Sequence, residues 1–373
     1  MRITFSNPLE LGRTGAGRPY GYLYDHLVNK QKEHEVRFVS GMAHVRKLFG
    51  ATAPAAESLE QGSMSDMLIT LDDADFAYCD VFLGCGCASL QQIREINHPG
   101  SNARLSRAET TGKFPKIITT WFSTHYVNAS RILTEEYAKV GMDVRHPVDP
   151  FLMWRDKHEQ GMSDVLLVPS EACAETYEAD PICRGKTRIV PFGVDCGIFH
   201  PTESTIEDFR VLFVGGNWVR KGLPYLIKAW NGLKLQEATL TLAGCNVPAV
   251  YTYRTAKLGF VGDEEVPKLY RKNNVFILPT LEEGSALAVL EAMASGCAVI
   301  TTKEAGSPIE DGKDGLLIPS KDVQAIAGAL KHLNENPSEV KRLGENARKK
   351  AETLTWERFG EAVVKVCEEV ASK

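Results

Sequence analysis

The chain lacks the features that mark several large classes of protein. No apolar run approaches the ~20 residues of a membrane-spanning helix, and the opening MRITFSNPLELGRTG holds no apolar stretch typical of a signal peptide. The formal net charge is only −5, so no broad attraction to nucleic acid is expected. We therefore expect a cytoplasmic protein that binds no nucleic acid. Peripheral attachment to a membrane surface and the oligomeric state stay open.

The chain also lacks a recognisable metal-binding pattern. It has nine cysteines, but Cys85 and Cys87 lie in LGCGCASL at a spacing that matches no zinc motif, and no second pair follows at ligand distance. Asp72, Asp73 and Asp75 are interpreted as a solvated loop. We expect buried free thiols in a reducing compartment, and neither a metal ion nor a cofactor.

Short apolar runs alternate with longer amphipathic runs from end to end. Strands that alternate with helices imply βαβ units and a parallel sheet, and 373 residues exceed what a single core usually holds. The predicted strands of the first half span 2–5, 35–40, 81–85, 116–121, 164–170 and 187–192. Those of the second half span 210–215, 239–244, 257–262, 275–280, 298–302 and 315–320. The sequence thus predicts an α/β fold with two doubly wound domains.

The domain boundary is expected near 196–208, where the polar stretch CGIFHPTESTIEDF precedes a new strand. We assign residues 1–200 to the first domain and 205–355 to the second. The remaining stretch, 356–373, reads as a helix with Phe359, Val363 and Val366 on one side. Because it follows a complete second sheet, we expect this helix to pack back on the first domain.

Two loops of the second domain have the composition of a diphosphate site. GGNWVRKG (215–222) follows one strand, and its glycines permit close backbone approach while Arg220 and Lys221 bring positive charge. EEGSA (282–286) follows another strand and ends at a helix N-terminus, which favours an anion. Neither loop is a Walker motif or a GxGxxG. The alternative is that Arg220 and Lys221 are solvated charges in a turn.

Two carboxylates stand eight positions apart, Glu283 just before the predicted helix 285–296 and Glu291 within it. Leu287, Leu290, Glu291 and Ala294 share one helix face, so Glu291 should point inward and needs a polar partner. A ribose diol would supply hydroxyl donors to Glu291, and Glu283 would meet a sugar on the other side of the phosphates. The residues therefore point to a nucleotide sugar. The alternatives are a rim salt bridge for Glu291, and a first-turn acid that stabilises the helix dipole for Glu283 or Glu282.

The segment EGSALAVLEAMASGCAVI resembles the signature of the retaining glycosyltransferases of family 4, in which two Glu flank seven residues. Other segments resemble the family in the same order along about half of the chain. They are DVLLVPSEA, RIVPFGVDCGIFHP, VLFVGGNWVRKG, DGLLIPSKD and TWERFGE. The resemblance implies a GT-B fold, in which two Rossmann-like domains face each other across a cleft.

The resemblance also implies an activity. The second domain would bind a nucleotide-diphosphate sugar, with UDP expected ahead of GDP. The first would bind a carbohydrate, lipid-linked or small-molecule acceptor, and the sugar would be transferred with retention and without a metal ion. Carried over by position, the catalytic candidates are Glu283, His125, Arg220 and Lys221. His125 is placed by TTWFSTHYVN, which follows a central strand of the first domain.

The donor-binding candidates come from three loops and one helix. They are Gly15, Gly17, Gly215, Gly216, Arg220, Lys221, Glu283, Gly284, Ser285, Ala286, Leu287 and Glu291. Two positions depart from the family pattern. Gly216 stands where the family often has Arg, and Ser285-Ala286 stands where it often reads Phe-Gly.

Other functions remain open at this point. A non-catalytic nucleotide-sugar-binding subunit would need the same loops, a glycoside hydrolase would use the Glu pair as acid and nucleophile or base, and a nucleotide-sugar epimerase would share the architecture. The basic turn and the helix start argue against a simple hydrolase, which needs neither.

Overall fold

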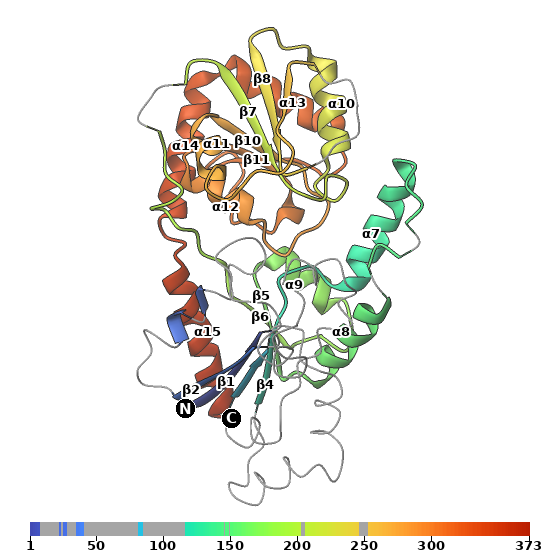
Figure 1. Ribbon diagram of the computed structural model, residues 1–373, viewed down its shortest axis with the longest axis vertical. Coiled ribbons are helices and arrows are strands. Elements are labelled where there is room, and N and C mark those ends of the chain that lie inside the picture. The colour runs from blue at the N-terminus through green and yellow to red at the C-terminus, as the bar shows by residue number, and fades with distance from the viewer. Residues whose placement is uncertain are drawn as a thin grey trace, which may run out of the picture.

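The computed structural model describes residues 1–7, 22–23, 25–27, 35–40, 81–84, 116–144, 146–148, 150–202, 206–245 and 253–373. The predictions for Gly15 and Gly17, for the loop 72–75, and for Cys85 and Cys87 lie outside these residues. The described residues form two six-stranded sheets, one in each half of the molecule (Figure 1). We call the parts around them the first and the second domain.

The first sheet is parallel and has the order β2-β1-β3-β4-β5-β6. Its strands are β1 (Arg2–Asn7), β2 (Glu35–Ser40), β3 (Val81–Gly84), β4 (Lys116–Thr120), β5 (Val165–Val168) and β6 (Thr187–Ile189). Its described helices are α7 (Tyr126–Lys139), α8 (Pro150–Met162) and α9 (Glu171–Glu178). This is the doubly wound arrangement that the sequence predicted.

The second sheet is also parallel and has the order β12-β11-β10-β7-β8-β9. Its strands are β7 (Phe209–Val214), β8 (Ala238–Ala243), β9 (Thr255–Lys257), β10 (Val275–Leu278), β11 (Ala298–Thr301) and β12 (Leu316–Leu317). Its helices are α10 (Leu223–Leu233), α11 (Val266–Arg271), α12 (Leu287–Ala294), α13 (Val323–Glu335) and α14 (Pro337–Ala351), with the short η5 (Lys303–Ala305). In the opposite direction the order is β9-β8-β7-β10-β11-β12, in which the first three strands run backwards along the chain and the last three forwards. This is the strand order of a Rossmann fold.

All twelve strands of the described residues overlap predicted ones. The largest shift is at β9, which we predicted over 257–262 and which ends at Lys257. Leu258 still donates a backbone hydrogen bond to Leu242, but Gly259 then adopts a left-handed φ of 62° and turns the chain away. The segment 190–208 joins the two sheets, and the exact domain limits stay predictions.

The C-terminal helix α15 (Trp356–Ala371) leaves the second domain and packs against β3 and β4 of the first, as predicted (Figure 1). Thr355 caps it by accepting a hydrogen bond from the Arg358 N–H. Phe359 and Val363 are buried, and Trp356 stacks on Tyr22 with ring centroids 4.6 Å apart. None of the described helices is long and apolar enough to cross a membrane.

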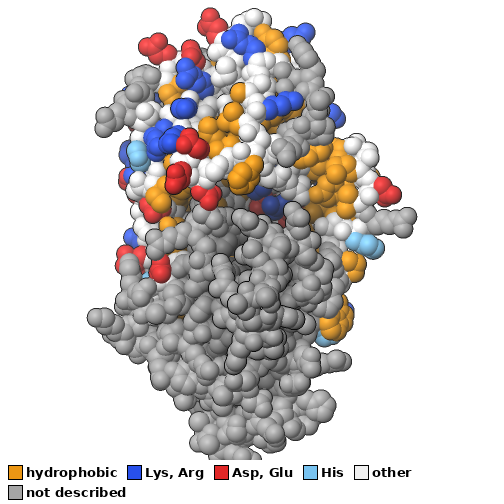
Figure 2. Space-filling model, viewed as in Figure 1, with side chains coloured by type: hydrophobic (Ala, Val, Ile, Leu, Met, Phe, Trp, Pro, Cys, Tyr) orange, Lys and Arg blue, Asp and Glu red, His pale blue; other side chains and the backbone are white. Residues whose placement is uncertain are grey.

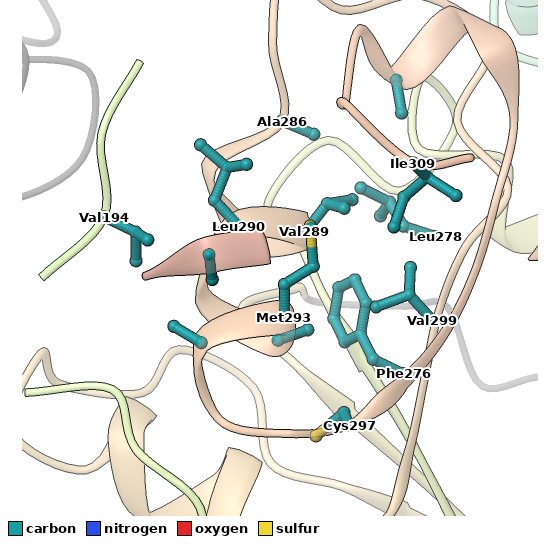
Figure 3. Packing of buried hydrophobic residues seen from close by; sticks show 14 of the residues in the cluster. Val194, Phe276, Leu278, Ala286, Val289, Leu290, Met293, Cys297, Val299 and Ile309 are labelled. Atoms are coloured by element: carbon teal, nitrogen blue, oxygen red, sulfur yellow. The ribbon is translucent and has the colours of Figure 1, made fainter. Parts of the chain in front are cut away.

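Helix α12 is the buried centre of the second domain. Val289 and Met293 point toward Phe276 of β10 and Val299 of β11, and Leu290 points to the other side, toward Val194 (Figure 3). Every residue of α12 from Val289 to Ala294 is buried, so the helix has little freedom to shift. On the face of this domain that Figure 2 shows, acidic and basic side chains are interspersed without a large region of one sign.

We predict that Gly193→Ala destabilises the protein by about 1–3 kcal/mol, the range for overpacking a core. A Cβ at Gly193 would overlap the backbone nitrogen of Trp356, at the point where Val194 bonds to Leu354. The matched control is Gly328→Ala in α13, where a Cβ meets nothing within 4 Å. That change should raise stability slightly, because alanine favours a helix. Equal denaturant midpoints for the two variants would contradict the close packing.

Candidate functional site

The topology of the second sheet brings the two predicted phosphate loops together. Strand order reverses between β7 and β10, which pair directly, and ligands of doubly wound sheets bind at such a switch point, beyond the carboxyl ends of the strands. The loop 215–222 follows β7 and the loop 281–286 follows β10. The Arg220 carbonyl accepts hydrogen bonds from the Leu281 N–H (2.9 Å) and the Thr280 hydroxyl (3.1 Å), which fixes one loop against the other.

Glycine is required at the end of the first loop. Gly222 has a left-handed φ of 72° and lies so close to Pro279 that a Cβ would overlap its carbonyl oxygen. This contact seats the start of α10 on the segment just after β10 and holds Arg220 and Lys221 over the switch point. Gly215 is bonded to Ala243 of β8, and Gly216 is exposed.

Four charged side chains meet between the loops. Lys221 Nζ forms an ion pair with Glu283 Oε1, and Arg220 Nη1 lies 3.1 Å from the same oxygen and 3.5 Å from Glu282 Oε1. Glu282, Glu283 and Lys221 are buried, whereas 27% of the Arg220 side chain is exposed. The solvated-turn alternative therefore does not describe Lys221. The cluster balances two cations against two carboxylates.

The cluster fixes the protonation state of Glu283. Burial raises the pKa of this carboxyl, but the charges of Lys221 and Arg220 more than offset burial, so its pKa lies below the usual value. Burial lowers the pKa of Arg220, and the carboxylates of Glu283 and Glu282 raise it above its usual value. Glu283 is therefore an anion across the physiological range and a poor proton donor.

The helix start beside the cluster is only partly free. Ala286 is the N-cap residue of α12 but offers no capping side chain, and its own N–H is bonded to the Ala305 carbonyl (2.8 Å). The first N–H groups of a helix have no partner within it, so those of Leu287 and Ala288 are the candidates for an anion. Ser285 is buried.

Gly284 is where the first domain touches this loop. The Ser170 hydroxyl donates a hydrogen bond to the Gly284 carbonyl (2.6 Å), and a Cβ on Gly284 would overlap the Phe122 carbonyl oxygen. Next to it, the Thr124 hydroxyl donates a hydrogen bond to Glu282 Oε2. The predicted phosphate loop is thus also a contact between the domains. Sequence reasoning missed Thr124 and Ser170, since neither residue type carries a signal of its own.

Glu291 is buried, as its place in the helix predicted, but it has a partner within the protein. The Tyr270 hydroxyl of α11 donates a hydrogen bond to Glu291 Oε2 (2.9 Å) and lies 3.1 Å from the Ala288 carbonyl oxygen. A tyrosine two elements earlier therefore contributes to the polar environment that we had assigned to a ribose. The ribose role of Glu291 stays a prediction.

His125 lies inside the first domain. Its ring is 2% exposed, with Nε2 3.1 Å from Gln160 Oε1 and 3.6 Å from Asp180 Oδ2, and it packs against Tyr126 and Tyr177. Burial lowers the pKa of His125, although Asp180 and the hydrogen bond to Gln160 act to raise it. These contacts give His125 a structural role as the residue that precedes α7, and its catalytic role stays a prediction.

A larger groove of about 1290 Å³ lies elsewhere, at the opposite ends of the second-domain strands. Phe209, which begins β7, and Asn274, which precedes β10, are among its lining residues. Because ligands of this fold bind at the carboxyl ends of the strands, the loops 215–222 and 281–286 are the better candidate despite the smaller space around them.

Comparisons with known proteins cover this part of the chain. Residues 208–336, which include both loops and both flanking Glu residues, match the family model described as Glycosyl transferases group 1. The MMP alpha-(1->4)-mannosyltransferase of Mycolicibacterium hassiacum is 26% identical over 238 residues, which are 60% of this chain and 58% of that protein. A D-inositol 3-phosphate glycosyltransferase of Streptomyces avermitilis is 30% identical over 51% of this chain and 47% of its own length. The chain thus spans roughly half the length of these relatives.

Two solved structures resemble the whole chain. Sucrose-phosphate synthase from Thermosynechococcus elongatus covers 100% of it at a TM-score of 0.68 and 18% identity, with 99% of that chain aligned. Anabaena Alr3699/HepE in complex with UDP-glucose covers 99% at a TM-score of 0.62 and 15% identity, with 100% of its chain aligned. At such identities the likeness shows the fold, which is GT-B, with two Rossmann-like domains.

We predict that Thr124→Val destabilises the protein by about 1–3 kcal/mol, because it leaves Glu282 without its buried hydroxyl donor. Thr124→Ser keeps the donor and is the matched control, expected within about 0.5 kcal/mol of the original. Denaturant melts of the three proteins measure this difference. If valine and serine behave alike, the hydroxyl does not hold Glu282.

A second prediction concerns pH. His125 has a lowered pKa in the fold, so below its ordinary value of 6.5 the unfolded chain takes up a proton before the folded chain does. The contribution of His125 to the stability of the fold should be fully present above pH 6.5, and it should be lost as the pH falls below that value. His125→Gln removes this contribution and should flatten the loss of melting temperature between about pH 7.5 and 5.5. The exposed His158, changed to Gln, is the control, and an unchanged slope in His125→Gln would contradict the assignment.

Proposed function

We propose that the chain is a glycosyltransferase that moves a sugar from a nucleotide-diphosphate sugar to an acceptor hydroxyl. The observation that carries the proposal is the meeting of Arg220, Lys221 and Glu283 at the switch point, beside the start of α12. The match of residues 208–336 to Glycosyl transferases group 1, and the transferase names of the relatives, support it.

The diphosphate has donors on two sides in this proposal. Arg220, whose side chain is partly exposed, offers a planar fork to phosphate oxygens, Lys221 offers a compact charge, and the N–H groups at Leu287 and Ala288 offer the helix dipole. The phosphate oxygens compete with Glu283 for both cations. Gly215 and Gly216 leave room for close backbone approach on the side of β7. Gly15 and Gly17 stay predicted contacts from the first domain.

The two flanking carboxylates bind hydroxyls at opposite ends of the donor. Glu283 accepts hydrogen bonds from the transferred sugar, and Glu291 accepts them from the ribose together with Tyr270. UDP is proposed ahead of GDP, in line with the UDP-glucose complex of Anabaena Alr3699/HepE. The lowered pKa of Glu283 excludes it as the proton-donating acid of the hydrolase alternative.

Transfer proceeds with retention and needs no protein nucleophile. The acceptor hydroxyl attacks the anomeric carbon from the face that the diphosphate leaves, the bond to the diphosphate breaks, and a diphosphate oxygen takes the acceptor proton. Arg220 and Lys221 stabilise the charge that builds on the leaving group, so this scheme requires no metal ion. Proton removal falls to the diphosphate rather than to His125, whose ring is buried against Gln160.

We predict that Arg220→Lys lowers the affinity for UDP by about tenfold, because lysine keeps the charge but loses the bidentate fork. The charge balance with Glu282 and Glu283 is kept, so the variant should fold. Lys228→Gln, at an exposed position of the adjacent helix α10, is the control and should bind UDP normally. Calorimetric titration with UDP and GDP measures both. Unchanged UDP affinity in Arg220→Lys would contradict binding of the diphosphate by this turn.

Turnover separates an enzyme from a binding subunit. The chain should release UDP from a UDP-sugar faster when an acceptor is present, and proton NMR of the product should show the anomeric configuration of the donor. Tight UDP binding without turnover for any acceptor would support the binding subunit, and an inverted product would contradict retention.

A further inference from the structure

Helix α7 reaches from the first domain to the turn that carries Arg220 and Lys221. The hydroxyl of Tyr137, in the last turn of this helix, accepts a hydrogen bond from the side-chain amide of Asn217 (2.8 Å). The Asn217 side chain also accepts a hydrogen bond from the Arg220 N–H (3.1 Å), and the Asn217 carbonyl accepts one from the Lys221 N–H (2.9 Å). One residue of the loop, Asn217, thus connects the first domain with the backbone of both cations.

The C-terminal turn of α7 fixes the backbone of Tyr137. Gly141 follows the helix with a left-handed φ of 74°, which glycine adopts without steric cost. The Met142 N–H donates a hydrogen bond to the Tyr137 carbonyl (2.9 Å), and the Gly141 N–H donates one to the Ala138 carbonyl (3.1 Å). These are the two hydrogen bonds of a Schellman motif. The Tyr137 side chain therefore leaves α7 from a defined position.

The residue before Tyr137 docks the same turn of α7 on the second domain. Glu136 accepts a hydrogen bond from the Tyr225 hydroxyl of α10 (2.6 Å) and forms an ion pair with Lys321 (2.8 Å). The Glu136 side chain is 4% exposed, so water has little access to these contacts. Tyr137 and Tyr225 thus each supply one hydroxyl to the contact between α7 and the second domain, but Tyr137 binds Asn217 whereas Tyr225 binds Glu136.

The orientation of the Asn217 amide depends on both of its partners. The last torsion of an asparagine side chain has a broad energy well, and Asn217 is only half-buried. Without the Tyr137 hydroxyl, the amide can rotate and water can replace it at the Arg220 N–H. A turn that samples several positions presents the Arg220 fork less precisely, and a phosphate must then restrict the turn as it binds, which lowers affinity.

We propose that Tyr137 is a positioning residue for the donor diphosphate, and that it acts through Asn217 on the turn of Arg220 and Lys221. The inference rests on the proposed function, because this turn is the one assigned to the phosphates. The backbone of the turn is held from the first domain, while the Arg220 side chain stays free to reach a phosphate. Phosphate binding therefore depends on the docking of α7, and separation of α7 from the second domain favours release of the diphosphate product.

Tyr137→Phe tests the proposal, because it removes the hydroxyl and keeps the ring. We expect UDP binding to weaken about three- to tenfold, which corresponds to the loss of one hydrogen bond. Uridine binding should stay unchanged, because uridine carries no phosphate. Tyr225→Phe is the matched control, since it also removes one hydroxyl between α7 and the second domain but keeps the contact of Tyr137 with Asn217. It should retain the original ratio of UDP affinity to uridine affinity.

Calorimetry measures UDP binding, ligand-observed NMR measures uridine binding, and melting temperatures show whether the variants are folded. A double-mutant cycle with Asn217→Ala tests the route. Asn217→Ala should weaken UDP binding at least as much as Tyr137→Phe does, and Tyr137→Phe should have no further effect in the Asn217→Ala protein.

Four results overturn the proposal: unchanged UDP affinity in Tyr137→Phe, an equal loss of uridine affinity, the same loss of UDP affinity in Tyr225→Phe, or additive losses in the double variant. The second and third of these would assign Tyr137 to domain docking in general. Absence of UDP binding by the original protein would overturn the proposed function itself, and this inference with it.

Discussion

The site depends on one interaction, the ion pairs that Lys221 and Arg220 make with the buried carboxylate of Glu283. An unpaired carboxylate at that depth would cost several kcal/mol or take up a proton, and the lowered pKa of Glu283 shows that the two cations prevent this. The pairing of β7 with β10 brings the partners together, because one strand leads to the cations and the other to the carboxylate. The parallel pairing of β7 with β10 thus places the cations beside Glu283 and keeps that carboxyl ionised.

The same loop also connects the domains. Glu282 accepts a hydrogen bond from Thr124, and the Gly284 carbonyl accepts one from Ser170, so first-domain side chains hold the loop that carries Glu283. On the other side of the loop, α7 is joined to the second domain through Glu136. Burial raises the pKa of Glu136, but hydrogen bonds from Lys139, Lys321 and Tyr225 lower it below the usual value. Glu136 is therefore ionised in this contact between the domains. A change in the angle between the domains therefore changes the surroundings of the charged site directly.

The sequence predicted the parts of this structure that depend on local pattern. Strands, the two loops and the crossing of α15 follow from periodicity, from glycine, and from the apolar side formed by residues such as Phe359 and Val363. The contacts between distant segments could not be read in this way. The hydrogen bond from Tyr270 to Glu291 and that from Thr124 to Glu282 join residues 21 and 158 positions apart, and a tyrosine or threonine at such distances has no distinguishing spacing. His125 shows the opposite case, in which a chemically suggestive residue type is placed among the side chains of its own domain.

Glu282 and Glu283 are neighbours in the chain but have different tasks because their partners differ. Glu283 is held by two cations, so under the proposed function the incoming diphosphate changes its surroundings most. Glu282 is shared between the more distant Arg220 and the Thr124 hydroxyl, so it keeps a donor from the first domain when Arg220 turns to a phosphate. Both line a cavity between the domains. Under the proposed function, Arg220 can therefore move toward the donor without leaving Glu282 as a buried carboxylate that lacks a partner, provided that the domains stay docked.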